Sequence, residues 1–303
     1  MEYSFTRYLA AKKTVDDRAL NRLVWGTLAR LLHGHQGTVG VVEPGAGIGT
    51  MLERLSGWSL LTEADYLGFD LQSENIATAR QRLPAWAEAN GYRVDIDEED
   101  GYYLAKGRQE IRARFETADL LDFLTRPEGR QRYDLLVAHA FLDLLDLSGN
   151  LPDLLSLLRP GGLFYFTLNF DGMTLFEPIL DPVFDEQVLA LYHRTMNERR
   201  VNDRPAGDSR TGRHLFHHLQ VTGAEILESG ASDWVVFPRQ GGYPSDEAYF
   251  LHFILHFFDE SLSGHAELDA GQFADWLAQR HAQIERGELV YLAHQLDFVG
   301  QMP

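Results

Sequence analysis

The sequence contains no cysteine and very little lysine. Without cysteine there is no disulfide framework, no thiolate zinc site and no cysteine nucleophile. Its only lysines are Lys12, Lys13 and Lys106, and with 27 basic against 45 acidic residues the formal charge is −18. So acidic a surface repels phosphate backbones, and the chain has no local basic patch. We therefore predict no nucleic-acid partner and interpret the acidity as an aid to solubility.

Long hydrophobic runs are also absent. The stretches 163–168 and 250–258 are apolar but fall well short of the roughly 20 residues that span a bilayer. The first residues lack the basic region and apolar run of a secretory signal peptide. We therefore expect a cytoplasmic protein with no membrane partner. The sequence carries no signal for an oligomeric state.

Strand and helix patterns alternate through the first half of the chain. Apolar residues in 1–35 follow helical spacing until Gly34 ends the pattern. An Asp100-Gly101 pair between two β-rich runs in 91–112 indicates a hairpin. Elsewhere, short β-rich runs alternate with helical patterns, which predicts an α/β fold with a parallel sheet. These runs are residues 38–43, 66–70, 114–118, 133–138 and 162–168.

The rhythm changes after Phe170. Residues 171–213 are polar, with one helix expected near 185–197. We expect this segment to be mobile without ligands and ordered when they bind, because it shows little apolar periodicity. Strands are expected again at 224–237 and 288–299, with helices in 245–286 between them. The domain prediction is a helical N-terminal cap (1–35), a cofactor-binding core (36–170), and cap or lid insertions with the last two strands (171–303).

The strongest local motif is a glycine-rich loop after the first β-rich run. Three glycines let the backbone turn sharply and approach a ligand without Cβ clashes. The dinucleotide fingerprint needs Gly-x-Gly-x-x-Gly or Ala, whereas position 50 here is Thr, so the spacing favours a ligand other than NAD. The loop reads Val42-Glu43-Pro44-Gly45-Ala46-Gly47-Ile48-Gly49-Thr50.

This region resembles the class I S-adenosylmethionine-dependent methyltransferases, in which an acidic residue precedes a Gly-x-Gly-x-Gly loop. The resemblance covers residues 38–170 and implies S-adenosylmethionine as the cofactor. It also implies a Rossmann-like seven-stranded methyltransferase sheet with an antiparallel seventh strand and, in this chain, helical cap insertions. The family's turn into its fifth strand is matched by Leu157-Leu158-Arg159-Pro160-Gly161-Gly162.

The resemblance assigns contacts to the cofactor as well. Asp70 lies where the family accepts hydrogen bonds from both ribose hydroxyls. Asp119 lies where the adenine amino group is bound, with the Leu120 amide nearby. The alternative for both carboxylates is that they are helix N-caps, where Asp is common. The predicted cofactor-binding residues are Glu43, Gly45, Ala46, Gly47, Asp70, Leu71, Asp119, Leu120 and His139.

His139 is the candidate catalytic residue. It follows the fourth predicted strand, at the carboxyl edge where open α/β sheets bind ligands. A histidine there could act as general base, because its ordinary pKa lies near neutrality. It could equally pack against the cofactor or cap the next helix. The sequence has no Asn-Pro-Pro-Tyr or Asp-Pro-Pro-Tyr at this point, which argues against methylation of DNA bases or glutamine.

Two further groups of polar residues are candidate binding sites. Arg210, Arg213 and His214 form a pattern typical of an anion-binding turn into a helix, and we predict that they contact substrate. A solvated loop tied to acidic neighbours is the alternative. His252 and His256 have a spacing that suits a metal, but in so aromatic a helix we favour packing and predict no metal site.

The predicted function is therefore S-adenosylmethionine-dependent methylation of a small molecule, on oxygen or nitrogen. A cap over the carboxyl edge suits a small substrate, because it excludes water and holds the nucleophile in line with the methyl group. Two alternatives stay open. One is another transfer on the same fold, such as aminopropyl transfer, and the other is a noncatalytic cofactor-binding regulatory module.

Overall fold

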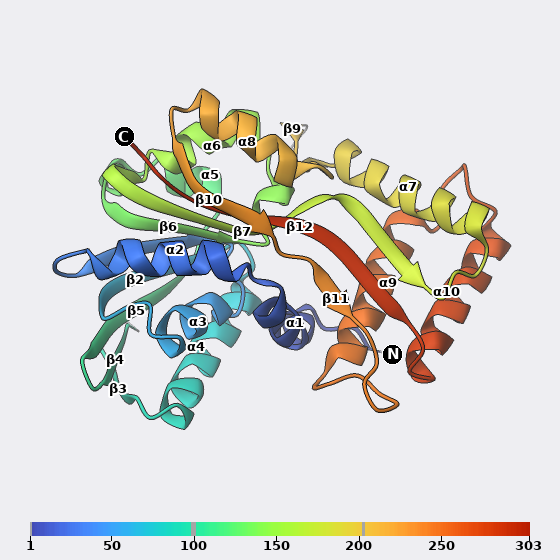
Figure 1. The fold of residues 1–303 in the computed structure, drawn as a ribbon, viewed down its shortest axis with the longest axis horizontal. Helices are drawn as coiled ribbons and strands as arrows, with labels where there is room; N and C mark the ends of the chain where they lie inside the picture. Colours follow the sequence, from blue (N-terminus) through green and yellow to red (C-terminus); the bar gives the residue numbers. More distant parts are fainter. Residues whose placement is uncertain (1, 98–100, 202–203) are drawn as a thin grey trace.

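The protein folds around one long sheet (Figure 1). The computed structural model describes residues 2–97, 101–201 and 204–303. Within them the main sheet has ten strands, and seven of these follow the order β10-β12-β7-β6-β1-β2-β5. In that order they are Glu225–Ala231, Val290–Gln301, Leu158–Glu177, Tyr133–His139, Val39–Pro44, Glu63–Asp70 and Gln109–Thr117.

The direction of these strands confirms the predicted Rossmann-like sheet. Every neighbouring pair from β7 to β5 is parallel, whereas β12 runs antiparallel to both β7 and β10. The strand expected at 288–299 is β12, and the region expected at 224–237 forms β10 and β11 (Trp234–Val236), both paired with β12. The antiparallel seventh strand is therefore present.

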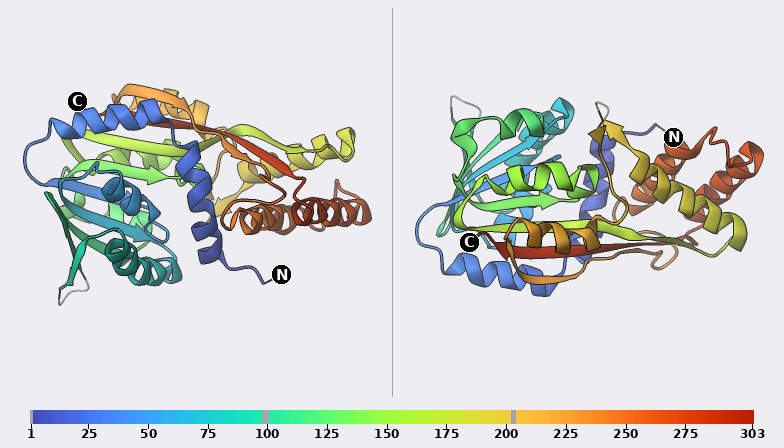
Figure 2. Two further views of the ribbon diagram at one scale, coloured as in Figure 1. Left: turned by 60° about the horizontal axis from the view of Figure 1, so that its bottom comes forward. Right: turned by 90° about the horizontal axis from the view of Figure 1, so that it is seen from above.

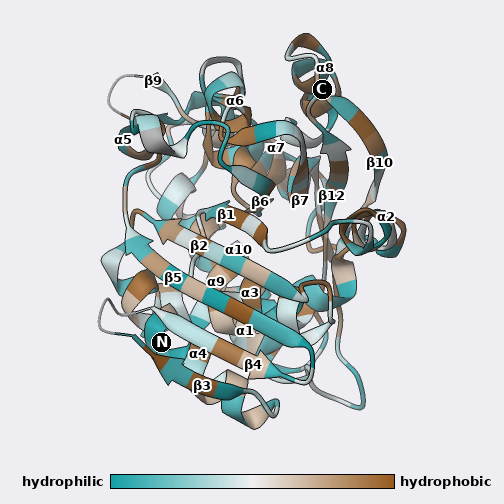
Figure 3. Cartoon of the chain, turned by 90° about the vertical axis from the view of Figure 1, so that its left-hand side faces the viewer, coloured by the Kyte–Doolittle hydropathy of each residue, from teal (hydrophilic) through white to brown (hydrophobic). Residues whose placement is uncertain are grey.

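A hairpin extends the sheet beyond β5. β3 (Arg93–Ile96) and β4 (Tyr102–Lys106) pair antiparallel, and β4 continues the pairing onto β5, as the sequence predicts. The predicted turn falls partly on residues 98–100, which lie outside the described residues. Along β5 buried and exposed residues alternate, because this edge of the sheet is covered on one face only (Figure 3).

Helices cover both faces of the central strands, so the sheet separates two cores. α2, α3 and α4 pack on one face, and α5, α6 and α8 pack on the other. β6 is buried along its whole length, which explains why its sequence is a continuous apolar run. These helices are Arg22–His33, Thr50–Gly57, Ser73–Ala89, Leu120–Leu124, Leu147–Leu155 and Thr211–Val221.

β7 and β12 continue past this core as a paired ribbon that reaches Glu177 and Val290. Three helices pack on this extension, namely α7 (Pro182–Glu198), α9 (Glu247–Leu262) and α10 (Ala270–Glu285). α1 (Phe5–Ala19) stands between the core and the extension (Figures 1 and 2). The N-terminal helix thus contacts both parts of the molecule.

The remaining elements are short. They are the 3-10 helices η1 (Pro127–Gly129) and η2 (Leu142–Leu144), and the two-stranded pair β8 (Arg200–Val201) and β9 (Arg204–Pro205). None of the helices in the described ranges is both long enough and apolar enough to cross a membrane.

The chain beyond Phe170 is more regular than the predicted boundary at residue 170 indicates. The core boundary at residue 170 falls inside β7, which runs unbroken to Glu177 because β12 pairs with it throughout. Within residues 171–213 the helix predicted near 185–197 is confirmed as α7. In α7, Phe184, Val188 and Leu191 lie on one buried face, because they are spaced four and three residues apart. Little of this segment is therefore an unsupported loop.

A buried ion pair holds the extension together and supplies a stability test. Arg280 on α10 is fully enclosed, and it donates to Asp185 of α7 at 2.6 Å and to the Pro178 carbonyl at 2.8 Å. Asp185→Ala leaves this guanidinium buried without its anion, so it should lower the free energy of unfolding by about 3–5 kcal/mol. Urea denaturation measures this, with the exposed neighbour Glu186→Ala as control. Equal stability of the two variants would contradict the prediction.

Candidate active site

The glycine loop connects β1 to α3 at the carboxyl edge of the sheet. Gly45, Gly47 and Gly49 have φ angles of 65°, 54° and 81°, in the left-handed region that favours glycine. A Cβ on Gly45 would lie only 2.3 Å from the ring of Phe141, so a side chain is excluded there by packing as well. The loop is closed by the Ala46 amide, which donates to the Phe69 carbonyl at 3.0 Å.

Asp70 lies beside this loop, at the end of β2. One carboxylate oxygen accepts from the Gly47 amide at 3.0 Å. The other accepts from the Gln72 amide at 2.8 Å and from the Asn75 side chain at 3.1 Å. The structure therefore brings together two features that lie 23 residues apart in the sequence. Leu71, which follows, is exposed.

Asp119 lies at the end of the neighbouring strand. β2 and β5 pair in register up to Asp70 and Thr117, and the Ala118 amide donates to the Asp70 carbonyl. The Asp119 carboxylate accepts from the Leu121 amide at 2.7 Å and the Asp122 amide at 3.3 Å, as the N-cap of α5. The prediction that Asp119 is a helix N-cap is therefore confirmed. The Leu120 side chain is buried in the core.

Glu43 occupies a different position from the one expected. Its side chain is 2% exposed and accepts a hydrogen bond from the Tyr66 hydroxyl below the loop. Burial raises the pKa of the Glu43 carboxyl to about 8, although the Tyr66 bond and the Arg54 charge oppose this. Such a carboxyl supports the glycine loop from inside the protein. This differs from the direct cofactor contact that the sequence predicts, because the side chain turns towards the interior.

His139 ends β6 and is buried under α1. Its Nδ1 lies 2.8 Å from the Thr167 hydroxyl. Nε2 lies 3.0 Å from the Asp16 carboxylate and 3.1 Å from the Arg54 guanidinium. Burial, followed by the charges of Arg54 and Lys12, lowers the pKa of His139 to about 4. The imidazole is therefore neutral near pH 7.

Asp16 is the centre of this buried network, and the sequence analysis did not identify it. It accepts from Lys12 at 2.6 Å, from the Trp234 indole at 2.9 Å and from Arg54 at 3.4 Å. Burial opposes ionisation of Asp16, but Lys12 and His139 outweigh it and hold its pKa below the ordinary value. Lys12 and Asp16 are four residues apart on the same face as Tyr8 and Val15. A charged pair on an apolar helix face was the available signal.

The predicted substrate contacts are taken by acidic neighbours. Arg213 forms a two-pronged pair with the Asp171 carboxylate at 2.8 and 3.0 Å. His214 bonds to Asp208 at 2.5 Å, and the Arg210 side chain is exposed. α8, which carries Arg213 and His214, packs on the face of the sheet opposite to α1. The structure therefore does not bring Arg213 and His214 together with His139. Their charges are compensated by Asp171 and Asp208 instead.

The two histidines considered for metal binding lie on α9. His252 contacts His281 at 2.7 Å and Glu285 at 2.9 Å, and His256 stacks on Tyr3 with ring centroids 4.0 Å apart. Across the described ranges, no group of three or more His, Asp and Glu side chains has an arrangement that would hold a metal ion.

Comparison with known proteins gives similarity to solved structures only. No protein-family model and no curated protein sequence matches the chain. A methyltransferase from Thiobacillus denitrificans, solved with S-adenosyl-L-homocysteine, is 13% identical over 100% of both chains, with a TM-score of 0.48. A methyltransferase from Geobacter sulfurreducens, solved with the same compound, is 15% identical over 98% of both chains, with a TM-score of 0.48. A cyclopropane synthase from Mycobacterium tuberculosis is 12% identical over 98% of both chains, with a TM-score of 0.44.

The environment of His139 predicts its titration. Its pKa of about 4 lies below the ordinary value of 6.5, so between these pH values the unfolded chain binds the proton and the folded protein does not. Stability should therefore fall on acidification from pH 6.5 towards 4, by about 1.4 kcal/mol per pH unit for this one proton. His139→Gln should remove that part of the slope, whereas the exposed His217→Gln should retain it.

Nuclear magnetic resonance can follow the imidazole directly. The ring protons of His139 should shift with an apparent pKa well below 6. A titration midpoint near 6.5 in the folded protein would show that the buried network with Asp16 and Arg54 does not form.

Proposed function

We propose that this protein is an S-adenosylmethionine-dependent methyltransferase that acts on a small-molecule acceptor. The observation that carries the proposal is the bond between the Gly47 amide and the Asp70 carboxylate, at the carboxyl edge of a Rossmann-like sheet. This hydrogen bond joins the loop, whose glycines have left-handed φ angles, to the aspartate at the end of β2. Ligands of open α/β sheets bind at this edge.

The residues around the loop fit an adenosyl group. Among the described residues, Asp70 Oδ2 accepts a single hydrogen bond, and a carboxylate has about four acceptor sites, so capacity remains for ribose hydroxyls. Asp119 ends the next strand, where the adenine would lie, with the Leu120 amide beside it. The exposed Leu71 side chain offers an apolar surface for the base. Gly45, Ala46 and Gly47 would line the side that faces the amino acid portion.

When bound, this cofactor supplies an electrophilic methyl group on a sulfonium. The chain's own contribution is position and exclusion of water. α1 covers the carboxyl end of β6, and Leu9 of that helix lies 3.3 Å from where a Cβ on Gly47 would be. α1 is thus the wall between the glycine loop and the helices of the extension.

We assign His139 a positioning role within this site. Both of its nitrogens already contact protein groups, and its lowered pKa makes it a weak base at neutral pH. It fixes α1 against the sheet edge through Asp16. Removal of an acceptor's proton by His139 would first require the Asp16 contact to open. His139 thus remains part of the proposed site. Its main task there is to hold α1 in position, and it does not act mainly as a general base.

The cofactor can be identified by titration calorimetry. S-adenosylmethionine and S-adenosylhomocysteine should bind, whereas NAD should not, because the glycine spacing does not match its fingerprint. Preference for decarboxylated S-adenosylmethionine would favour aminopropyl transfer instead. Tight binding without transfer in a screen against metabolite pools would favour a noncatalytic regulatory module. Transfer to an oxygen or nitrogen of a soluble metabolite would support the proposal as stated.

The assignment of Asp70 to the ribose has its own test. Asp70→Ala should weaken S-adenosylhomocysteine binding by about ten- to hundredfold, because the loss of a charged acceptor leaves hydroxyls unpaired. Asp65→Ala is the matched control, since Asp65 lies on the same strand but is exposed, in a long 3.5 Å pair with Arg112. Calorimetry at a temperature where both variants are folded gives the affinities. If Asp70→Ala binds as tightly as Asp65→Ala, the ribose assignment is wrong.

A further inference from the structure

Two histidines meet at the contact between α9 and α10. His252 of α9 is buried, and its Nδ1 lies 2.7 Å from the Nδ1 of His281 on α10. The two rings are 22° from parallel, with centroids 5.0 Å apart. The Nε2 of His252 lies 2.9 Å from the carboxylate of Glu285, which is also on α10. The proposed cofactor site does not include this pair, so its close approach has a separate cause.

The chemistry of the partners shows where the protons of this pair lie. A carboxylate only accepts hydrogen bonds, so the Nε2 of His252 carries a proton. When His252 is neutral, its Nδ1 therefore has a free lone pair, and the Nδ1 of His281 donates the bond between the rings. When His252 takes up a proton on Nδ1, the bond persists only if His281 carries its own proton on Nε2 instead.

A second added proton does not fit this geometry. It would leave an N–H on both Nδ1 atoms, which are 2.7 Å apart, and a positive charge on both rings. Two donors without an acceptor between them lose their hydrogen bond, and like charges in a poorly solvating interior repel. The contact between His252 and His281 therefore accommodates one added proton at most.

The charged groups around the pair do not remove this limit. Burial lowers the pKa of both histidines, and the charge of His252 lowers that of His281 further. The chain's amino terminus adds to the lowering. Glu285 raises both pKa values and Asp259 of α9 raises that of His281, but neither effect outweighs burial. The side chain of Glu285 is 68% exposed, so solvent screens its charge.

The other histidine on this part of α9 belongs to a different contact. His256 stacks on Tyr3 with ring centroids 4.0 Å apart, and its Nε2 lies 3.5 Å from Glu260. Neither of these partners is on α10. The contact between α9 and α10 therefore takes its histidine chemistry from His252 and His281.

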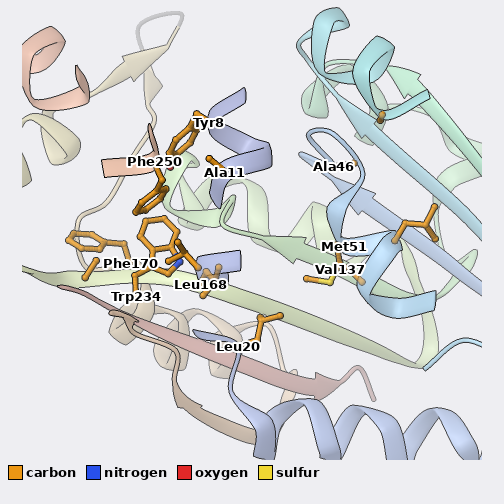
Figure 4. Packing of buried hydrophobic residues seen from close by; sticks show 14 of the residues in the cluster. Tyr8, Ala11, Leu20, Ala46, Met51, Val137, Leu168, Phe170, Trp234 and Phe250 are labelled. Atoms are coloured by element: carbon orange, nitrogen blue, oxygen red, sulfur yellow. The ribbon is translucent and has the colours of Figure 1, made fainter. Parts of the chain in front are cut away.

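α9 is also the helix that supports α1. Figure 4 shows Tyr8 of α1 facing Phe250 of α9, and their rings stack with centroids 5.7 Å apart. Arg18 of α1 donates to the fully buried Glu247 of α9 at 2.8 Å. His252 follows Phe250 by two residues in the same helix. A change in how α9 sits on α10 therefore also changes the support of α1.

We propose that His252 and His281 form a proton-sensitive clamp between α9 and α10, which is closed at neutral pH and opens when both rings are protonated. Opening gives each Nδ1–H access to water and separates the two charges. Acidification then loosens α10 first and weakens the support of α1 through α9. The clamp belongs to the extension, so it acts independently of the reaction that the cofactor site performs.

Amide hydrogen exchange on the full-length protein tests the clamp. Below the ordinary histidine pKa of 6.5, the open pair binds at least one more proton than the closed pair. The opening equilibrium should therefore increase by about tenfold per pH unit. After correction for the intrinsic pH dependence of exchange, the amides of α10 should lose protection by this factor as the pH falls from 6.5 to about 5.

A variant that keeps the contact but does not titrate separates the clamp from general acid destabilisation. In His281→Asn, the amide group can donate to the Nδ1 of His252 or present its oxygen to a protonated ring. The acid-dependent loss of protection in α10 should therefore be about tenfold smaller per pH unit than in the wild type. His217→Asn, an exposed change on α8, should retain the wild-type response. An equal pH response in His281→Asn and the wild type overturns the clamp.

Nitrogen-15 resonances of the imidazoles give a second measurement, which needs no variant. At neutral pH, His252 should show a protonated Nε2 and an unprotonated Nδ1. As the pH falls, the two rings of the folded protein should together gain one proton at most, because their titrations are coupled. Two independent protonation steps, each near the ordinary pKa of 6.5, would show that the doubly charged pair fits the folded structure and would overturn the proposal.

Discussion

The buried carboxylate of Asp16 is the contact on which the arrangement of the site depends. It joins Lys12 on its own helix to Arg54 of α3, His139 of β6 and Trp234 of β11. Four elements that are distant in the sequence thereby meet at one charge. Breaking a buried ionic group of this kind is far more costly than losing an exposed pair, because the remaining charges stay in a poorly solvating interior. The position of α1 is therefore fixed by electrostatics as well as by packing.

The long ribbon of β7 and β12 gives this network its second support. The two strands belong to the central sheet at one end and carry the aromatic helices at the other. Trp234 lies on β11, which pairs with β12, so its bond to Asp16 ties α1 to the ribbon. The aromatic residues of α9 then complete the contact surface on α1. Core and extension consequently share one continuous hydrophobic core.

Much of the cofactor side follows from local sequence patterns. The glycine spacing, the acidic strand end at Asp70 and the strand and helix alternation are each short-range signals, and they predict the sheet and the loop correctly. The orientation of Glu43 is not local, because it depends on Tyr66 of the neighbouring strand. A pattern of residue types locates such a carboxylate on the strand but does not show which neighbour it meets.

The substrate side was less accessible to prediction for a physical reason. Lys12 and Asp16 lie on a helix whose apolar spacing indicates a cap, and they pair with each other. The further partners of Asp16, Arg54 and His139, lie 38 and 123 positions away in the sequence. Phe184, Val188 and Leu191 lie in a segment of high average polarity, where one buried face is enough to fix the predicted helix, but its packing partners lie elsewhere in the chain. The spacing of apolar residues shows which face of a helix is buried. It does not show which side chains of other elements meet that face, and this site is assembled from four elements.

The glycine loop and the segment that follows β6 are linked by one close contact. Phe141 packs where a side chain on Gly45 would stand, which is possible only because that residue is glycine. The segment from His139 to Asp143 therefore lies directly against the loop proposed to hold the cofactor. Transfer of a methyl group requires the acceptor within about 3 to 3.5 Å of the methyl carbon and in line with it. The contact between Phe141 and Gly45 couples the glycine loop to the segment after β6, so a shift of the loop would also displace that segment. In the proposed reaction this site would contribute position more than proton removal.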